Sequence, residues 1–587
     1  MPSEKTNKFS VFKILKTGEH SLMAVLALIV GILAGFGAVG FRHLINFFQM
    51  LAYGSSDVLL DVVKSVPWYL RIAIPAVGGL IIGPMVYFFA REAKGHGVPE
   101  VMESVAMHGG VIRKRIVAIK TLVSAICIAT GGSVGREGPI VQIGSAIGSF
   151  VGQAINTSPD RMRTLVGCGA AAGIAATFNA PIAGTMFTLE IILGEFGVAT
   201  FSPIVISSVM ATVISRYFLG DYPAFVVPTY QLVSVWEFPL YLILGLACAF
   251  IGFLFVKALY FTEDLFDDFK FPEYLKAVVG GLMLGCMGLV FPHILGVGYG
   301  SIDLALVQKL SWWLMLMLIL VKILATSITI GSGGSGGIFA PSLFLGAMTG
   351  GAFGLMVHSL FPTITASPGA YAIVGMAAVV SATTHGSLTA ILMLFEMTGE
   401  YRIILPLMMT CIVSTLAVRN LSRESIYTLK LVRRGVDIRE GREVNVLKAI
   451  SVKDVMNSKV ETVTEKMGLS EISERVAKSK HNSFPVLDHA GKLTGILSYN
   501  DYRDALFDED LKDLVIARDL ATMNPVTVTM ENNLYDTLQL ISQKDFSIIP
   551  VVSPKDASEL VGVVSRRDIV GAYEKALIKI SLLNRAK

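Results

Sequence analysis

The sequence predicts an all-α membrane domain that crosses the bilayer many times and contains two repeated halves of opposite topology, followed by an α/β soluble domain. Three observations support this prediction. Only 16% of the 587 residues are charged, against about 25% in soluble proteins. The mean hydropathy is +0.64. Internal repeats occur both in the apolar part and in the charged C-terminal part of the chain.

Long charge-free segments indicate the membrane helices. Such segments run from Ser21 to Phe41, from Thr164 to Leu189 and from Ile323 to Phe395. Since one helical crossing needs about 20 apolar residues, the third segment must contain several membrane elements. A very large soluble core is the alternative, and it does not explain segments of this length without a charge.

Composition also predicts the domain boundaries, because charged residues return every few positions after Leu429. We expect a cytoplasmic N-terminus over residues 1–20, a membrane domain over 21–437, a linker over 438–447, and two soluble modules over 448–510 and 511–587. The lysines before the first span are Lys5, Lys8, Lys13 and Lys16. By the positive-inside rule they place the N-terminus in the cytoplasm. The charged tail is expected there too, which makes the number of crossings even.

The two halves of the membrane domain repeat at an offset of 202 residues. Lys120 and Gly131–Pro139 match Lys322 and Gly333–Pro341, and Gly169–Glu190 matches Gly375–Glu396 at an offset of 206. Glycine-interrupted segments at matching places are typical of transporters built from structural repeats. Broken backbone at membrane depth must line a cavity or be buried in protein, so both glycine-rich runs are expected at one central site. Ordinary small-residue helix packing is the alternative, but it does not explain the matched lysine and proline.

The tail repeats at an offset of 67 residues, with Gly495–Asp501 matching Gly562–Asp568. Each copy combines short apolar strands, such as 484–487 and 548–552, with amphipathic helices, such as 469–477. This pattern predicts two α/β modules related by a pseudo-two-fold axis.

Three loops have the composition that an anion site needs. They are Gly95–Glu100, Gly135–Pro139 and Gly337–Pro341, and each combines glycine with proline near a predicted helix start. Backbone N–H groups at helix N-termini provide partial positive charge, which holds an anion weakly enough for it to leave again. Glycine lets the backbone approach the ion closely.

These loops resemble the three signature loops of the CLC family of chloride channels and chloride/proton antiporters, and the tail resembles the CBS pair that many members carry. The resemblance covers almost the whole chain. It implies an anion site formed by His96, Gly97, Arg136, Glu137, Gly138, Ile338, Phe339 and Tyr427.

Within that site the resemblance implies separate roles. Glu137 matches the gating glutamate, whose carboxylate competes for the anion site until it is protonated or swings away. The backbone N–H groups of Ile338 and Phe339 and the hydroxyl of Tyr427 match the groups that hold the central ion. The alternatives are a purely structural salt bridge for Glu137 and an interfacial anchor role for Tyr427.

Two positions depart from the family pattern. The family usually has serine, or proline in nitrate-preferring members, where this chain has His96. A histidine can donate a hydrogen bond, add pH sensitivity or turn away, so the preference for chloride stays open. The family's antiporters relay cytoplasmic protons through a glutamate whose place is taken here by Ile191, and isoleucine cannot carry a proton.

The isoleucine favours an anion channel over the alternative, a chloride/proton antiporter. In an antiporter the proton path would use Glu137 together with Glu190 or Glu195. Chloride or a similar small anion is the expected transported ion in both cases, and no obligatory cofactor is expected. The family resemblance further implies a homodimer in the lipid of the cell membrane.

The CBS resemblance implies an adenosine-nucleotide site in the tail. Ser498 and Asp501, and their repeats Ser565 and Asp568, match the residues that bind phosphate and ribose. ATP, ADP or AMP is therefore the expected ligand. A scaffold that joins two subunits without a ligand is the alternative.

Other classes of function are less favoured. The five cysteines lie in apolar segments without metal-ligand spacing, so no metal site is expected, and a net charge of +4 gives no case for nucleic acid binding. Gly333–Gly337 formally matches a serine-nucleophile motif, with His385 as the candidate base. That motif requires a preceding strand, and a helix is predicted instead. An intramembrane serine protease is thus a remote alternative, and we expect the chain not to be an enzyme.

Overall fold

The structure is a computed structural model that describes residues 19–583, apart from residues 58, 91–93, 226, 228–229, 231, 438–440, 449, 480, 504, 506–513 and 545. The four N-terminal lysines used above to orient the chain lie outside the described residues. The chain divides between Arg434 and Gly435 into two compact units, a helical unit and an α/β tail. Each unit is described separately.

The first half of the helical unit consists of α2 (Glu19–Tyr53), α3 (Leu59–Ser65), α4 (Trp68–Phe89), α5 (Val98–Met107), α6 (Lys114–Ala129), α7 (Glu137–Ala154), α8 (Pro159–Phe178), α9 (Pro181–Phe187) with its π-helical extension η2 (Thr188–Leu193), and α10 (Val198–Leu219). The second half consists of α11 (Glu237–Asp268), α12 (Glu273–Val290), η3 (Pro292–Ile294), α13 (Tyr299–Leu306), α14 (Trp312–Gly331), α15 (Phe339–Leu360), α16 (Pro368–Thr384), α17 (Ser387–Thr398) and α18 (Ile404–Leu421), followed by the short α19 (Thr428–Arg433).

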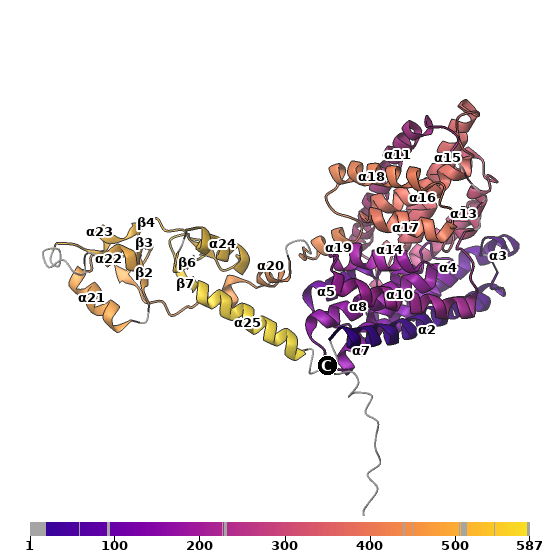
Figure 1. Ribbon diagram of the computed structural model, residues 1–587. Coiled ribbons are helices and arrows are strands. Elements are labelled where there is room, and N and C mark those ends of the chain that lie inside the picture. The colour runs from indigo at the N-terminus through magenta and orange to yellow at the C-terminus, as the bar shows by residue number, and fades with distance from the viewer. Residues whose placement is uncertain are drawn as a thin grey trace, which may run out of the picture. The chain divides into compact units, whose positions relative to one another are not determined.

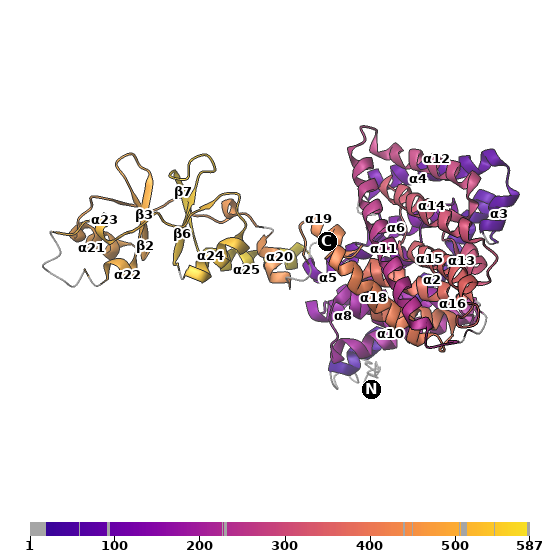
Figure 2. The same cartoon turned by 90° about the horizontal axis from the view of Figure 1, so that it is seen from above.

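The predicted all-α membrane domain is confirmed. Eight helices of the described chain are long and apolar enough to cross a membrane, namely α2, α4, α10, α11, α12, α14, α15 and α18. Figures 1 and 2 show them gathered with the shorter helices into one bundle that contains both halves. The shorter apolar helices, α9, α16 and α17, come from the glycine-rich repeats and are packed between the long ones.

The two halves pack by the same device. The backbones of α7 and α8 touch where Gly144 meets Gly169, and a Cβ on either glycine would collide with the carbonyl oxygen of the other. The backbones of α15 and α16 touch in the same way where Gly346 meets Gly375. Small residues permit such close helix contacts in a membrane, where water provides no hydrophobic drive. The repeat of the sequence is therefore a repeat of helix packing.

The tail contains two small sheets with the same register. Its elements are α20 (Gly441–Lys448), η5 (Val452–Asp454), β1 (Val463–Thr464), α21 (Leu469–Lys478), β2 (Ser483–Leu487), β3 (Leu493–Ser498), α22 (Tyr499–Tyr502), α23 (Ala517–Leu520), β4 (Thr522–Met523), β5 (Val528–Thr529), α24 (Leu534–Lys544), β6 (Ile548–Val552), β7 (Leu560–Ser565) and α25 (Arg566–Leu583). In both sheets a parallel pair, β1–β2 or β5–β6, is followed by an antiparallel pair, β2–β3 or β6–β7. The predicted α/β modules are confirmed.

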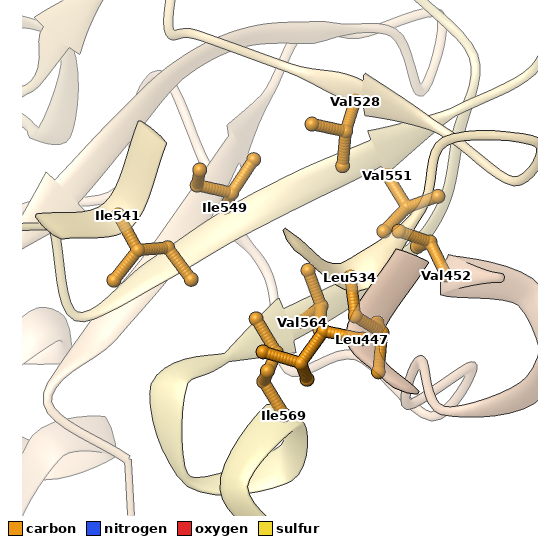
Figure 3. Packing of buried hydrophobic residues seen from close by; sticks show 9 residues of the cluster. All are labelled: Leu447, Val452, Val528, Leu534, Ile541, Ile549, Val551, Val564 and Ile569. Atoms are coloured by element: carbon orange, nitrogen blue, oxygen red, sulfur yellow. The ribbon is translucent and has the colours of Figure 1, made fainter. Parts of the chain in front are cut away.

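Two segments are exchanged between the modules. Leu447 of α20 and Val452 precede the first sheet in sequence, yet both belong to the hydrophobic core of the second module, which Figure 3 shows. The N–H group of Leu534 donates to the carbonyl of Ile450 at 3.0 Å. Conversely, Ala517 lies in the core of the first module. The core of each module therefore contains residues from the segment that precedes the sheet of the other module in sequence.

This exchange makes a prediction about stability. Leu447→Ala should lower the free energy of unfolding of the second module by about 2–3 kcal/mol, because it leaves a cavity in that core. Hydrogen exchange of the full-length protein should then rise over residues 528–569 more than over 463–502. Leu514→Ala is the control, since Leu514 is 77% exposed. Faster exchange confined to the first module would contradict the exchanged packing.

Candidate anion pathway

The glycine-rich loops of the two halves pair with each other by backbone hydrogen bonds. The N–H of Gly135 donates to the carbonyl of Gly337 at 2.7 Å, and the N–H of Gly337 returns a bond to Gly135 at 2.6 Å. Gly95 joins the same assembly, because its N–H donates to Gly334 at 3.2 Å and its carbonyl accepts from Gly336 at 3.3 Å. The pairing satisfies backbone groups that a membrane could not, and it brings the starts of α5, α7 and α15 to one place, as the repeat predicts.

Glu137 occupies the centre of this place. Its side chain is fully buried, and its Oε1 accepts hydrogen bonds from the backbone N–H groups of Phe339 at 2.6 Å and Ala340 at 3.1 Å. Its Oε2 is buried without a hydrogen-bond partner in the described chain. The free N–H groups at the start of a helix bind anions, so the α15 N-terminus holds a carboxylate where a free anion would equally fit.

The second wall of the site is formed by two aromatic rings. The rings of His96 and Tyr427 lie 5.8 Å apart, and each residue is only 1% exposed. Both ring nitrogens of His96 and the hydroxyl of Tyr427 are buried without a partner in the part of the chain that the structure describes. Buried polar groups without a partner indicate that an ion or a water molecule binds beside them. His96 has therefore not turned away to the surface.

Close backbone contact joins the two walls. A Cβ on Gly138 would collide with the carbonyl oxygen of His96 and come within 3.1 Å of the Cα of Gly337. Gly97 precedes α5 with a φ of +83°, a conformation that strongly favours glycine. The sequence-predicted residues His96, Gly97 and Gly138 are thus brought together by the backbone itself.

Two buried lysines bind carbonyl oxygens of the loops. Lys120 donates from Nζ to the carbonyl of Gly95 at 2.6 Å. Lys322, its repeat, donates to Ile294 at 2.9 Å and to Gly296 at 3.1 Å. Both lysines are fully buried. Because these ammonium groups bind carbonyl oxygens, their charge orients the loops and contributes positive potential near the path.

An ion-pair cluster ties the helix that follows Tyr427 to α5. Glu100 of α5 lies 3.7 Å from Nζ of Lys430 and 3.3 Å from the guanidinium of Arg434, and Glu103 pairs with Arg434 at 3.0 Å. The side chains of Glu100 and Lys430 are only 11% and 8% exposed. Since His96 lies just before α5 and Tyr427 caps α19, this cluster positions both rings. Sequence reasoning missed it, because the partners are more than 300 residues apart.

Glu190, which the sequence offered as a proton carrier, lies at the start of a helix of the other half. Glu190 accepts hydrogen bonds from the backbone N–H groups of Leu388 at 3.2 Å and Thr389 at 2.7 Å, so it caps α17. Glu396, its repeat, caps α9 through the N–H groups of Ile182 at 3.0 Å and Ala183 at 2.6 Å. Each half therefore caps a helix of the other. The sequence repeat matches Glu190 to Glu396, but only the fold shows that each of them caps a helix of the other half.

The remaining proton-path positions lie in η2 and just after it. Ile191 is 7% exposed, lies in the π-helical η2 and packs against Gly386. Glu195 lies beyond the end of η2, with its carboxylate 4.0 Å from the guanidinium of Arg163. A π-helix often marks a functional place in a membrane helix, and here it sets the side chain of Ile191 against the second half.

The residues expected to bind nucleotide form identical caps in the two modules. Asp501 accepts hydrogen bonds from the backbone N–H of Ser498 at 2.7 Å and from its hydroxyl at 2.6 Å. Asp568 accepts from the N–H of Ser565 at 3.0 Å and from its hydroxyl at 2.6 Å. The structure thus brings each predicted serine and aspartate together at the end of a strand.

Comparison with known proteins agrees with this geometry. A family model described as "Voltage gated chloride channel" matches residues 78–419, and one described as "CBS domain" matches residues 452–508 and 517–575. The chain belongs to the CLC family. Its CLC domain and its CBS pair were both predicted from the sequence, and the family is one of membrane proteins for anion transport.

Several CLC relatives resemble the chain over most of their length. The putative chloride channel protein ClcB-like of Ralstonia nicotianae is 35% identical over 419 residues, which cover 71% of this chain and 98% of that protein. The chloride channel protein CLC-e of Arabidopsis thaliana is 30% identical over 641 aligned positions, covering 96% and 89% of the two chains. The H(+)/Cl(−) exchange transporter ClcA of Klebsiella pneumoniae is 33% identical, covering 70% and 88%.

Solved CLC structures share the fold. A slow cyanobacterial Cl−/H+ antiporter superposes with a TM-score of 0.64 at 28% identity, covering 70% of this chain and 97% of that one. A eukaryotic CLC transporter superposes with a TM-score of 0.62 at 21% identity, covering 94% and 99%. The second likeness includes the tail and is a likeness of fold.

The ion-pair cluster makes a prediction about stability. Glu100→Gln should lower the free energy of unfolding by about 3 kcal/mol, because it leaves the buried ammonium of Lys430 without its carboxylate. Glu103→Gln is the matched control on the same helix, and its more exposed pair should contribute no more than about 1 kcal/mol. Thermal unfolding of the two purified variants in detergent compares them. Equal shifts would contradict a special role for Glu100.

Proposed function

We propose that the chain exchanges small anions, most simply chloride, for protons across the membrane, with Glu137 as the gate and the proton-accepting group. The observation that carries this proposal is the seat of the Glu137 carboxylate on the N–H groups of Phe339 and Ala340, at 2.6 and 3.1 Å. A carboxylate in an anion site must leave, or become neutral, before an anion can replace it. Protonation of the gate and passage of the anion are therefore linked by competition for the same N–H groups.

Comparison with known proteins also supports exchange. A relative and a solved structure described as H(+)/Cl(−) exchangers resemble the chain at 33% and 28% identity. The sequence had favoured a channel, and these observations favour its alternative.

Ile191 is the specific observation that supports the second candidate, a gated anion channel. An isoleucine packed against Gly386 offers no proton relay, and Glu190 is engaged as a helix cap. Exchange through this chain would then bring protons to Glu137 without a titratable side chain at position 191. In a channel, Glu137 would act as the gate alone.

Flux in liposomes with the internal pH recorded distinguishes the two functions. A chloride gradient imposed without a proton gradient should drive protons uphill in a fixed ratio if the chain is an exchanger. Glu137→Ala should abolish the proton movement and leave anion flux, because the carboxylate is both the gate and the proton acceptor. Wild-type chloride flux at constant internal pH would overturn exchange in favour of the channel, and absence of any anion flux would overturn both.

His96 is proposed as an anion ligand in place of the usual serine. A neutral imidazole always has one N–H donor, and a hydrogen bond to an ion contributes about 1.5–3 kcal/mol. His96→Phe, which keeps a ring of similar shape, should therefore weaken chloride binding about tenfold or more, measured by isothermal titration calorimetry. His96→Asn, which keeps a donor, should bind more tightly than His96→Phe. Unchanged binding in His96→Phe would assign the ring to the wall alone.

The remaining features belong to the same proposal. We propose that ATP, ADP or AMP binds at Ser498–Asp501 and Ser565–Asp568, that the chain forms a homodimer in the cell membrane, and that both termini are cytoplasmic. The exposed apolar side chains on α10 and α18 support contact with lipid or a second copy, and they include Phe201, Tyr217, Leu405 and Leu416. A ligand in the tail can bias the pathway only by binding one of its states more tightly.

A further inference from the structure

A cavity of about 440 Å³ lies beside α2, α3 and α13, apart from the site between Glu137 and Tyr427. It lies on the face of the membrane domain opposite α19. The helix α4 starts on this face, where Arg71 donates to the carbonyl of Lys64 in α3. It ends before Lys94, which pairs with Asp267 at the end of α11 that also pairs with Arg433 of α19.

Two arginines line this cavity, Arg42 from α2 and Arg136 from the start of α7. Among the described residues, no carboxylate oxygen lies within ion-pair distance of either guanidinium. Two carboxylates also line the cavity, those of Asp57 and of Asp303 in α13. Asp57 accepts a hydrogen bond from the hydroxyl of Ser55 at 2.7 Å. Because these carboxylates lie beyond ion-pair distance, the like charges of Arg42 and Arg136 repel each other, and an anion between them removes that repulsion.

Unsatisfied polar atoms gather at the wall of the same cavity. They are Nε of Arg136, the hydroxyl of Tyr299 and Nδ1 of His293, each buried without a hydrogen-bond partner in the described chain. The guanidinium of Arg136 lies over the ring of Tyr299, 5.4 Å from its centroid. Buried polar atoms of a native protein are rarely left unpaired, and these three can all donate a hydrogen bond.

The repeat provides an independent reason. The cavity loop Gly296–Tyr299 corresponds to the loop Gly95–Val98 at an offset of 201 residues. The glycines of both loops have positive φ, +63° and +91° in one and +89° and +83° in the other. Both loops also receive a bond from a buried lysine. The cavity loop is therefore the counterpart, on the opposite face, of the loop that carries His96.

We propose that this cavity is a second anion site, where Arg42, Arg136 and Tyr299 capture a small inorganic anion before it reaches Glu137. The cavity of about 440 Å³ has room for several water molecules of about 30 Å³ each. The anion would therefore keep part of its water. The capture role rests on the proposed transport of anions, whereas the binding of an anion in the cavity does not.

Bromide soaked into crystals of the full-length protein separates these claims. Anomalous scattering should locate bromide in the cavity, and Arg42→Gln should remove that peak while leaving bromide beside the His96 and Tyr427 rings unchanged. Arg42→Lys, which keeps the charge, should retain it. A cavity without bromide in the wild-type protein, or a peak unchanged in Arg42→Gln, would overturn the second site. Bromide absent only from the place beside the His96 and Tyr427 rings would instead count against the proposed function.

Flux measurements test the capture role. Arg42→Gln should raise the chloride concentration for half-maximal flux about tenfold while leaving the maximal flux within twofold, because the residue acts before the gate. Lys309→Gln is the control, since it removes one exposed cation after α13 outside the cavity. An equal effect of the two variants would reduce the role of Arg42 to general surface charge, and no effect of Arg42→Gln would overturn capture.

Discussion

The reciprocal backbone pairing of Gly135 and Gly337 is the interaction on which the rest of the membrane domain depends. At membrane depth an interrupted helix exposes N–H and carbonyl groups that lipid cannot satisfy. The two halves solve this for each other, with bonds of 2.7 and 2.6 Å. Once the loops are paired, α7 and α15 must start side by side, and Glu137 at the first turn of one meets the free N–H groups of the other.

The same physics recurs with different consequences. Carboxylates meet helix N-termini at Glu137, Glu190 and Glu396, and each bond joins one half of the repeat to the other. Glu190 and Glu396 bond with both oxygens, so they act as caps. Glu137 bonds with one oxygen and leaves the other unsatisfied among the described residues. A carboxylate with incomplete bonding in a buried anion site is easier to displace, which suits a gate.

Three cations around the Phe339 site are bound to oxygen atoms of the protein. Lys120 and Lys322 direct their ammonium groups to loop carbonyls, and the guanidinium of Arg434 is held by Glu100 and Glu103. An anion near Phe339 therefore meets partial charges of N–H groups within a positive surrounding. Such binding is favourable but weak, as conduction or exchange requires.

Sequence alone determined the architecture and most of the candidate site, because both are local properties. Charge-free segments reveal membrane helices, repeats reveal the two halves, and glycine next to proline marks interrupted helices. Glu137, His96 and Phe339 lie in these interrupted segments, and the resemblance to the CLC family singled them out there. The strand and helix pattern of the tail is likewise local.

Tertiary structure decided what depends on contacts between distant segments. The cluster of Glu100 with Lys430, the reciprocal caps of Glu190 and Glu396, and the seat of Leu447 in the core of the second module join residues that no local pattern connects. Ile191 favoured a channel on chemical grounds alone, whereas the distance of 5.8 Å between the rings of His96 and Tyr427 depends on the fold. The sequence determines the type of each side chain. The fold determines which polar groups find a hydrogen-bond partner, because it decides which distant groups come close together.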